Sequence, residues 1–317
     1  MILAFVLVIL GLVILVKGAD YLVMGSASIA KHFGVSSLVI GLTVVAFGTS
    51  LPELTVSVFA SLQGKSDITL GNIVGSNIAN ILLILGVTSI LSLLPVKHST
   101  AWKEIPFSLL AILAVGFLGA DTYFGQGEKN IISQGDGVIL IFFFILFLYY
   151  VANISKGEEN EDTGITKYTN LMSFFLIVGG LAALIIGGKM FVDGAVNIAK
   201  HLGMSERIIG LTIVAVGTSM PEFVTSVVAA RKGQNDIAIG NIVGSNIFNI
   251  FWILGFSALI NPVSLGANSF IDILMCIIAT VILFLALFIG KKNKLERWQG
   301  VIFIMVYSGY VVYLIQN

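Results

Sequence analysis

Two glutamates stand inside apolar stretches of this sequence, where charged side chains are rare. Glu53 closes the segment GLTVVAFGTSLPE, Glu222 closes GLTIVAVGTSMPE, and neither segment holds another charged residue. A carboxylate in such surroundings costs several kcal/mol unless a cation or hydrogen-bond donors compensate it. We therefore expect both side chains to bind cations.

Each glutamate follows a proline that should interrupt its helix. Pro52 has no amide hydrogen to donate to the carbonyl four residues back, at Gly48, and glycine removes the steric barrier to unwinding. Backbone carbonyls can then face a polar cavity. Every candidate ligand that these two segments add to the glutamates is an oxygen: the hydroxyls of Thr49, Ser50, Thr218 and Ser219, and the backbone carbonyls around Ala46–Gly48 and Ala215–Gly217.

A second duplicated element, GNIVGSNIAN and GNIVGSNIFN, ends at Asn80 and Asn249. In each copy a serine lies four residues before the final asparagine and so on the same helical face. We expect these two faces to flank the glutamates with Ser76, Asn80, Ser245 and Asn249. The repeated Asn72, Asn77, Asn241 and Asn246 fit interhelical hydrogen bonds better, and we leave them out of the cation site.

The ligand inventory selects hard cations. Carboxylate, hydroxyl and carbonyl oxygens suit Ca²⁺ and Na⁺, whereas histidine and thiolate would indicate softer metals. The three histidines lie at span ends or in loops, and Cys276 lies in an apolar span where it fits packing. Two carboxylates balance one Ca²⁺ or two Na⁺.

The elements that carry these residues must lie in a bilayer. With 57% hydrophobic and 11% charged residues, and a mean hydropathy of +1.02, the chain cannot cover a soluble globule. Unbroken apolar runs favour helices over barrel strands, so the predicted fold is an all-α integral membrane protein with ten transmembrane helices. The expected spans are 2–16, 35–62, 68–95, 105–120, 137–152, 170–188, 204–230, 236–262, 268–290 and 298–315, and we expect the first to be a span and not a cleavable signal peptide.

The sequence repeats itself with an offset of 169 residues. Gly25–Gly86 aligns without a gap to Gly194–Gly255, and 37 of the 62 positions are identical. Five helices separate corresponding points, so the second copy should cross the membrane inverted, as in many transporters. The predicted division is a first five-helix repeat over 1–155, a cytoplasmic linker over 156–169, and a second repeat over 170–317. The acidic linker fits a solvated connection, with a weak Ca²⁺ sensor as the alternative.

Lysine and arginine residues divide unevenly between the two sets of loops. Eleven fall on one side, four on the other, and Lys17 and Lys189 fall inside spans. The positive-inside tendency places the richer side in the cytoplasm and both termini outside. Lys17 with Asp20, and Lys189 with Asp193, are one helical turn apart and could pair or guide cations. Asp67 and Asp236 precede helices and fit caps.

These motifs resemble the alpha repeats of the sodium/calcium exchanger family, within the calcium/cation antiporter superfamily, in its compact prokaryotic form. GTSLPE and GTSMPE, each followed by GNIVGSN, carry the resemblance. It implies that the two glutamates bind Ca²⁺ with the motif threonines, that the motif serines and alanine carbonyls form Na⁺ sites, and that Asn80 and Asn249 form the central polar pair. Those roles fall on Glu53, Glu222, Thr49, Thr218, Ser50, Ser76, Ala46, Ser219, Ser245 and Ala215.

The sequence departs from the family at Asn249, where many members have aspartate, so the coupling ion and stoichiometry stay open. We expect Ca²⁺/Na⁺ antiport by alternating access in the cell membrane, with the lipid bilayer as surroundings, Ca²⁺ and Na⁺ as substrates, and no prosthetic group, nucleic acid or obligate protein partner. Ca²⁺/H⁺ antiport through the same glutamates is the alternative, although both copies read GNIVG and lack the GNxxE-like element typical of proton-coupled relatives. A cation channel is a rival of another class. An enzyme is disfavoured, because no HExxH or GxSxG motif is present.

Overall fold

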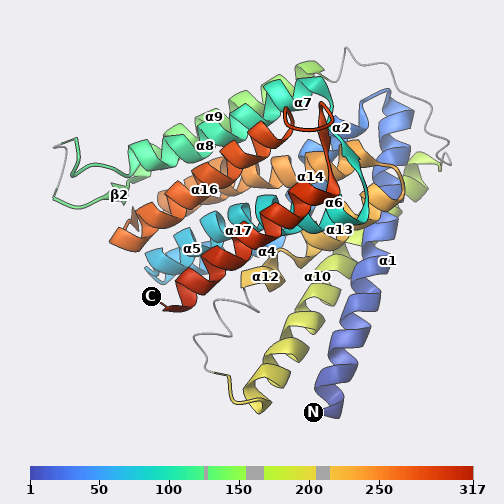
Figure 1. The fold of residues 1–317 in the computed structure, drawn as a ribbon, viewed down its shortest axis with the longest axis horizontal. Coiled ribbons are helices and arrows are strands. Elements are labelled where there is room, and N and C mark those ends of the chain that lie inside the picture. The colour runs from blue at the N-terminus through green and yellow to red at the C-terminus, as the bar shows by residue number, and fades with distance from the viewer. Residues whose placement is uncertain (125–127, 155–167, 205–214, 317) are drawn as a thin grey trace.

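The computed structural model describes residues 1–124, 128–154, 168–204 and 215–316, and every long element in it is a helix (Figure 1). The first half contains α1 (Ile2–Phe33), α2 (Ser37–Ile40), π-helical η1 (Gly41–Val45), α3 (Ala46–Thr49), α4 (Leu51–Leu62), α5 (Ser66–Ile78), π-helical η2 (Ala79–Leu85), α6 (Gly86–Leu91), β1 (Leu94–Pro95), α7 (His98–Trp102), α8 (Glu104–Leu118), β2 (Ile131–Ile132) and α9 (Gln134–Ile154). The second half contains α10 (Asn170–His201), α12 (Ala215–Thr218), α13 (Met220–Arg231), α14 (Asn235–Ile247), π-helical η4 (Phe248–Leu254), α15 (Gly255–Ile260), β3 (Val263–Ser264), α16 (Ala267–Ala286), β4 (Lys294–Leu295) and α17 (Arg297–Gln316).

The chain forms a multi-pass membrane protein. Among the described residues, eight helical segments are long and apolar enough to cross a bilayer, and α2–α4 makes a ninth that bends by 48°. The predicted span 204–230 runs through residues 205–214, which lie outside the described part. The total of ten spans therefore stays a prediction.

The first and sixth predicted spans, 2–16 and 170–188, are too short. Helices α1 and α10 each run for 32 residues, or about 48 Å at the rise of an α-helix, well beyond a hydrocarbon core of about 30 Å. The lysines inside them do not end the helices. Instead of pairing with Lys17 one turn away, Asp20 binds Lys232 beyond α13, with a 3.1 Å Oδ1–Nζ distance.

Helices α1 and α10 lie side by side, at an angle to most of the other long helices (Figure 1). Their contact is made through glycine, backbone against backbone. A Cβ on Gly11 would come within 2.8 Å of the Gly187 carbonyl oxygen, and one on Gly18 within 2.9 Å of the Gly180 carbonyl oxygen. Small residues allow such close approach between helices in lipid, where van der Waals packing holds them together.

The two copies of GNIVGSN occupy the most enclosed helices. In the most apolar stretch of each helical segment, 78% of the residues are buried in α5–η2–α6 and 83% in α14–η4–α15, whereas 28% are buried in α1. A π-helical turn follows each copy, η2 beginning at Ala79 and η4 at Phe248. Such turns are frequent at functional sites. The duplicated polar residues therefore lie at the centre of the molecule.

Two short antiparallel strand pairs join the halves. In one, Leu94 of β1 pairs with Leu295 of β4, and in the other Ile132 of β2 pairs with Val263 of β3. Strands β1 and β3 are themselves 169 residues apart, the offset of the sequence repeat. Each pair thus takes one strand from each half.

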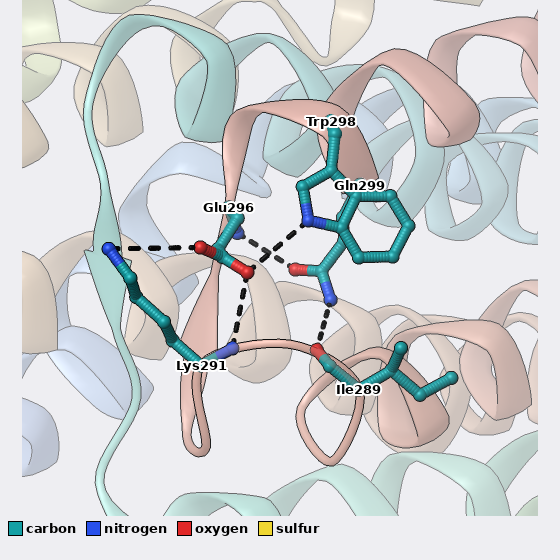
Figure 2. A network of polar contacts seen from close by, with 5 residues as sticks. All are labelled: Ile289, Lys291, Glu296, Trp298 and Gln299. Carbon is teal, nitrogen blue, oxygen red and sulfur yellow. Dashed lines mark hydrogen bonds and ion pairs between the residues drawn. The ribbon is translucent and has the colours of Figure 1, made fainter.

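The connection between α16 and α17 is fixed by one carboxylate (Figure 2). The Oε2 atom of Glu296 accepts hydrogen bonds from the backbone N–H of Lys291 at 3.1 Å and from Trp298 Nε1 at 3.2 Å. Gln299 accepts from the Glu296 N–H and donates to the Ile289 carbonyl. These donors, first the Lys291 N–H and then the indole, hold the pKa of Glu296 below its ordinary value.

The predicted helix caps at Asp67 and Asp236 are wrong. Both residues lie inside the first turns of α5 and α14, whose N-cap residues make no side-chain cap hydrogen bond. A carboxylate there still interacts favourably with the positive end of the helix dipole. Asp236 also binds Lys97, with 3.0 Å between Oδ2 and Nζ.

Candidate cation site

The backbone breaks two residues before each motif proline. Helix α3 ends at Thr49 and α4 begins at Leu51, with Ser50 between them at φ −84° and ψ 8°. Ser219 takes nearly the same conformation, φ −86° and ψ 9°, before α13. Proline suits the first positions of a helix, where its missing N–H is not needed. Glu53 and Glu222 therefore lie in the first turns of α4 and α13, where the helix dipole favours a carboxylate.

Each glutamate is held by serines of both repeats. Ser219 donates to Glu53 Oε1 at 3.0 Å and Ser50 donates to Glu222 Oε1 at 3.0 Å. The second serine of each set comes from the same repeat as its glutamate: at 3.4 Å, Ser76 donates to Glu53 Oε1 and Ser245 donates to Glu222 Oε1. The crossed bonds bring the two motifs together at one place.

Each glutamate keeps an oxygen to which no described residue donates a hydrogen bond. Glu53 and Glu222 are 0% and 1% exposed. Their Oε2 atoms, and the Oδ1 atoms of Asn80 and Asn249, have no hydrogen-bond partner in the described part of the chain. Buried oxygens of this kind are costly unless something positive meets them. These four oxygens, two of them on carboxylates, form a set of ligands that fits a hard cation.

Two repeated asparagines hold the main chain of the glutamates. The amide of Asn241 donates to the Glu222 carbonyl at 3.3 Å, and that of Asn72 donates to the Glu53 carbonyl at 3.2 Å. Asn241 Oδ1 also accepts the hydroxyl of Thr49 at 3.0 Å, which joins the two motifs a second time. The predicted interhelical role of these asparagines is confirmed.

Four further asparagines cross between the repeats. Asn80 donates to Asn246 Oδ1 at 3.0 Å, and Asn249 donates to Asn77 Oδ1 at 2.9 Å. Asn77 also donates to the Asn246 carbonyl at 3.1 Å. These bonds orient Asn80 and Asn249, whose own carbonyl oxygens stay unsatisfied among the described residues. Asn77 and Asn246 position the central pair.

The predicted backbone ligands are placed less simply. The carbonyl of Ala46 is not free, because it accepts the Ser50 N–H at 3.1 Å and the Thr49 hydroxyl at 3.3 Å. Ala215 begins α12, and its side chain lies outside the described part. Thr218 is half-buried and lines a cavity of about 360 Å³ beside the site.

Sequence reasoning missed one pair of supporting residues. Ser57 and Ser226 are fully buried, and their hydroxyls accept the amides of Asn72 and Asn241 at 2.9 and 3.0 Å. The available signal was their identity across the 169-residue offset. Both lie one turn beyond a motif glutamate and help to fix the asparagines that hold it.

This chain is similar to known proteins in both sequence and structure. A family model described as sodium/calcium exchanger protein matches residues 3–153 and 172–316. The sodium/calcium exchanger MaX1 of Methanosarcina acetivorans is 38% identical over 98% of both chains, and the inner membrane protein YrbG of Escherichia coli is 36% identical over 99% of this chain and 96% of its own. A solved structure of the sodium-calcium exchanger NCX_Mj, soaked with Na⁺ and without Ca²⁺, superposes with a TM-score of 0.84 at 35% identity over 98% of both chains. This chain therefore belongs to the sodium/calcium exchanger family.

Proposed function

We propose that this chain is a secondary active antiporter that exchanges Ca²⁺ for Na⁺ across the cell membrane by alternating access. The observation that carries the proposal is the set of four buried oxygens on Glu53, Glu222, Asn80 and Asn249 that lack a hydrogen-bond partner among the described residues. Family membership and the likeness to sodium/calcium exchangers support the choice of ions.

Different residues are proposed as ligands for Ca²⁺ and for Na⁺. Glu53 and Glu222 bind Ca²⁺ together with the hydroxyls of Thr49 and Thr218, which moves the oxygen count toward the six to eight that Ca²⁺ prefers. The flanking Na⁺ sites use the serines that contact the glutamates, with the alanine carbonyls. These are Ser50, Ser76 and Ala46 on one side and Ser219, Ser245 and Ala215 on the other, with Asn80 and Asn249 between them. The carbonyl of Ala46 would exchange its hydrogen bond from the Thr49 hydroxyl for the ion.

Two inverted five-helix repeats supply the means of exchange. The crossed hydrogen bonds and the strand pairs, each with one member from each half, support this arrangement over 1–155 and 170–317, with a cytoplasmic linker over 156–169. The loop charges support a cytoplasmic location for the lysine-rich side, with both termini outside. Two equivalent halves can exchange conformations and so expose one central site to either side.

Obligatory exchange follows from charge. An empty site would carry two buried carboxylates, which are costly to move through the low-dielectric centre of the protein. One Ca²⁺ or two Na⁺ would balance them. The loaded forms can therefore reorient, whereas the empty form cannot.

The deciding experiment is uptake of radiolabelled Ca²⁺ into proteoliposomes. Vesicles loaded with Na⁺ are compared with K⁺-loaded vesicles and with vesicles under an imposed pH gradient. Uptake driven only by the outward Na⁺ gradient is the expected result. Uptake driven only by protons would replace Na⁺ by H⁺ as the coupling ion, and flux that does not saturate or need a counter-ion would indicate a channel.

A further inference from the structure

The cavity beside the cation site has a mostly apolar wall that includes two charged residues. It lies between α10, the beginning of α4 and the break from α12 to α13, and its lining includes Pro52, Thr218 and Pro221. Each proline directly precedes a motif glutamate, and the two glutamates themselves are buried behind this lining. Lys189 and Asp193 of α10 complete this wall.

Lys189 lies near the middle of the 32-residue helix α10, and its side chain is exposed. Within the described residues it makes no ion pair. An ammonium group at that depth is costly in hydrocarbon and is found facing water or a protein cavity. Lys189 and Thr218 line the same cavity, so the ammonium group and the candidate site border one space.

We propose that Lys189 and Asp193 tune the cation affinity of the Glu53–Glu222 site through space, Lys189 lowering it and Asp193 raising it. This inference rests on the proposed function, since it concerns the same site. Neither side chain needs to touch the bound ion. A fixed charge interacts with an ion in proportion to the charge of that ion, so each residue acts twice as strongly, in free energy, on Ca²⁺ as on Na⁺. Each residue therefore shifts the selectivity between the two ions, and the two shifts are opposite in sign.

The test is equilibrium binding of radiolabelled Ca²⁺ to the purified protein, with Na⁺ as competitor, at constant ionic strength. Lys189→Met keeps the side-chain length and removes the charge. It should tighten binding of both ions, and the factor for Ca²⁺ should be the square of the factor for each Na⁺: about ninefold if Na⁺ changes about threefold. Asp193→Asn should weaken binding with the same relation, and the double variant should return toward wild type.

Three controls separate electrostatics from packing. Lys189→Arg keeps the charge and should bind like wild type. Lys17→Met removes a lysine from α1, which is not part of the described cavity wall, and should also bind like wild type. Raising the concentration of an inert salt should shrink the difference between Lys189→Met and wild type, because mobile ions screen charges in water.

The outcomes are distinct. Unchanged binding by Lys189→Met, or equal shifts for Ca²⁺ and Na⁺, would overturn the inference and leave the proposed function standing. Wild-type protein that binds no Ca²⁺ would overturn the proposed function itself.

Discussion

The two halves of the molecule are nearly the same at the centre and different at the flanks. Around Glu53 and Glu222 the serine hydrogen bonds match in partner and length. The two flanks are the places where a long helix meets the motif helix of the other half: α1 with α13, and α10 with α4. Helix α1 packs along α13 and the Asp20–Lys232 ion pair joins them, whereas a cavity separates α10 from α4. By the 169-residue offset, Asp20 corresponds to Lys189.

This difference separates two tasks. A centre in which each carboxylate has the same partners offers the ion equivalent contacts in either half. In the proposed function, flanks that differ would decide from which side the ion can arrive. Under the proposed mechanism, sealing of α10 on α4 and opening of α1 from α13 would interconvert the two access states. The equivalence of the glutamates and the inequality of the flanks can each be tested.

The largest expected effect comes from the centre. Glu53→Gln and Glu222→Gln should each reduce Ca²⁺ uptake by at least about 100-fold, because loss of one partner from a buried set of charges costs about 3–5 kcal/mol. Gln keeps the shape and can still accept the serine hydrogen bonds, so the protein should insert and remain monodisperse. Near-normal uptake by either variant would break the equivalence of the two halves.

Locking the sealed flank should come next. Asp20→Cys with Lys232→Cys, in a Cys276→Ser background, places two thiols where the wild-type side chains meet at 3.1 Å. A short cleavable bifunctional thiol reagent should reduce transport about tenfold or more by preventing α1 from leaving α13. Cleavage should restore it, and the single-cysteine variants serve as controls. Full transport by cross-linked protein would show that this flank does not move.

Weakening the same flank should have a smaller effect. The Asp20 and Lys232 side chains are 29% and 35% exposed, so their ion pair contributes at most about 1 kcal/mol. Asp20→Asn and Lys232→Gln should each change the initial rate of exchange by about fivefold or less. The double variant should match the single ones, because both remove one interaction. Additive losses in the double variant would show that the two residues act separately.

Sequence reasoning identified the helical membrane fold and gathered most of the site, because charge burial and the repeat act on residue type and spacing alone. Glu53, Glu222 and the four serines could be found in this way. The sequence did not place Asp20 beside Lys232, since that pairing depends on how α1 crosses α13. It also underestimated the lengths of α1 and α10, which continue past the exposed Lys17 and Lys189. It treated the carbonyl of Ala46 as free of local hydrogen bonds, although Thr49 and Ser50 donate to it.

The smallest effect is expected at the strand pair β1–β4, which lies outside both flanks. Glu296→Gln removes the charge that accepts the Lys291 and Trp298 N–H groups beside β4, and should lower the melting temperature by only about 1 °C. A lowered pKa means that the stabilisation by Glu296 is present above the ordinary pKa of glutamate and is lost as pH falls through the lowered pKa. The difference in melting temperature between wild type and variant should therefore shrink with acidification. Exchange rates at neutral pH should be unchanged. A large loss of transport would show that this end of the protein takes part in the conformational change together with the flanks.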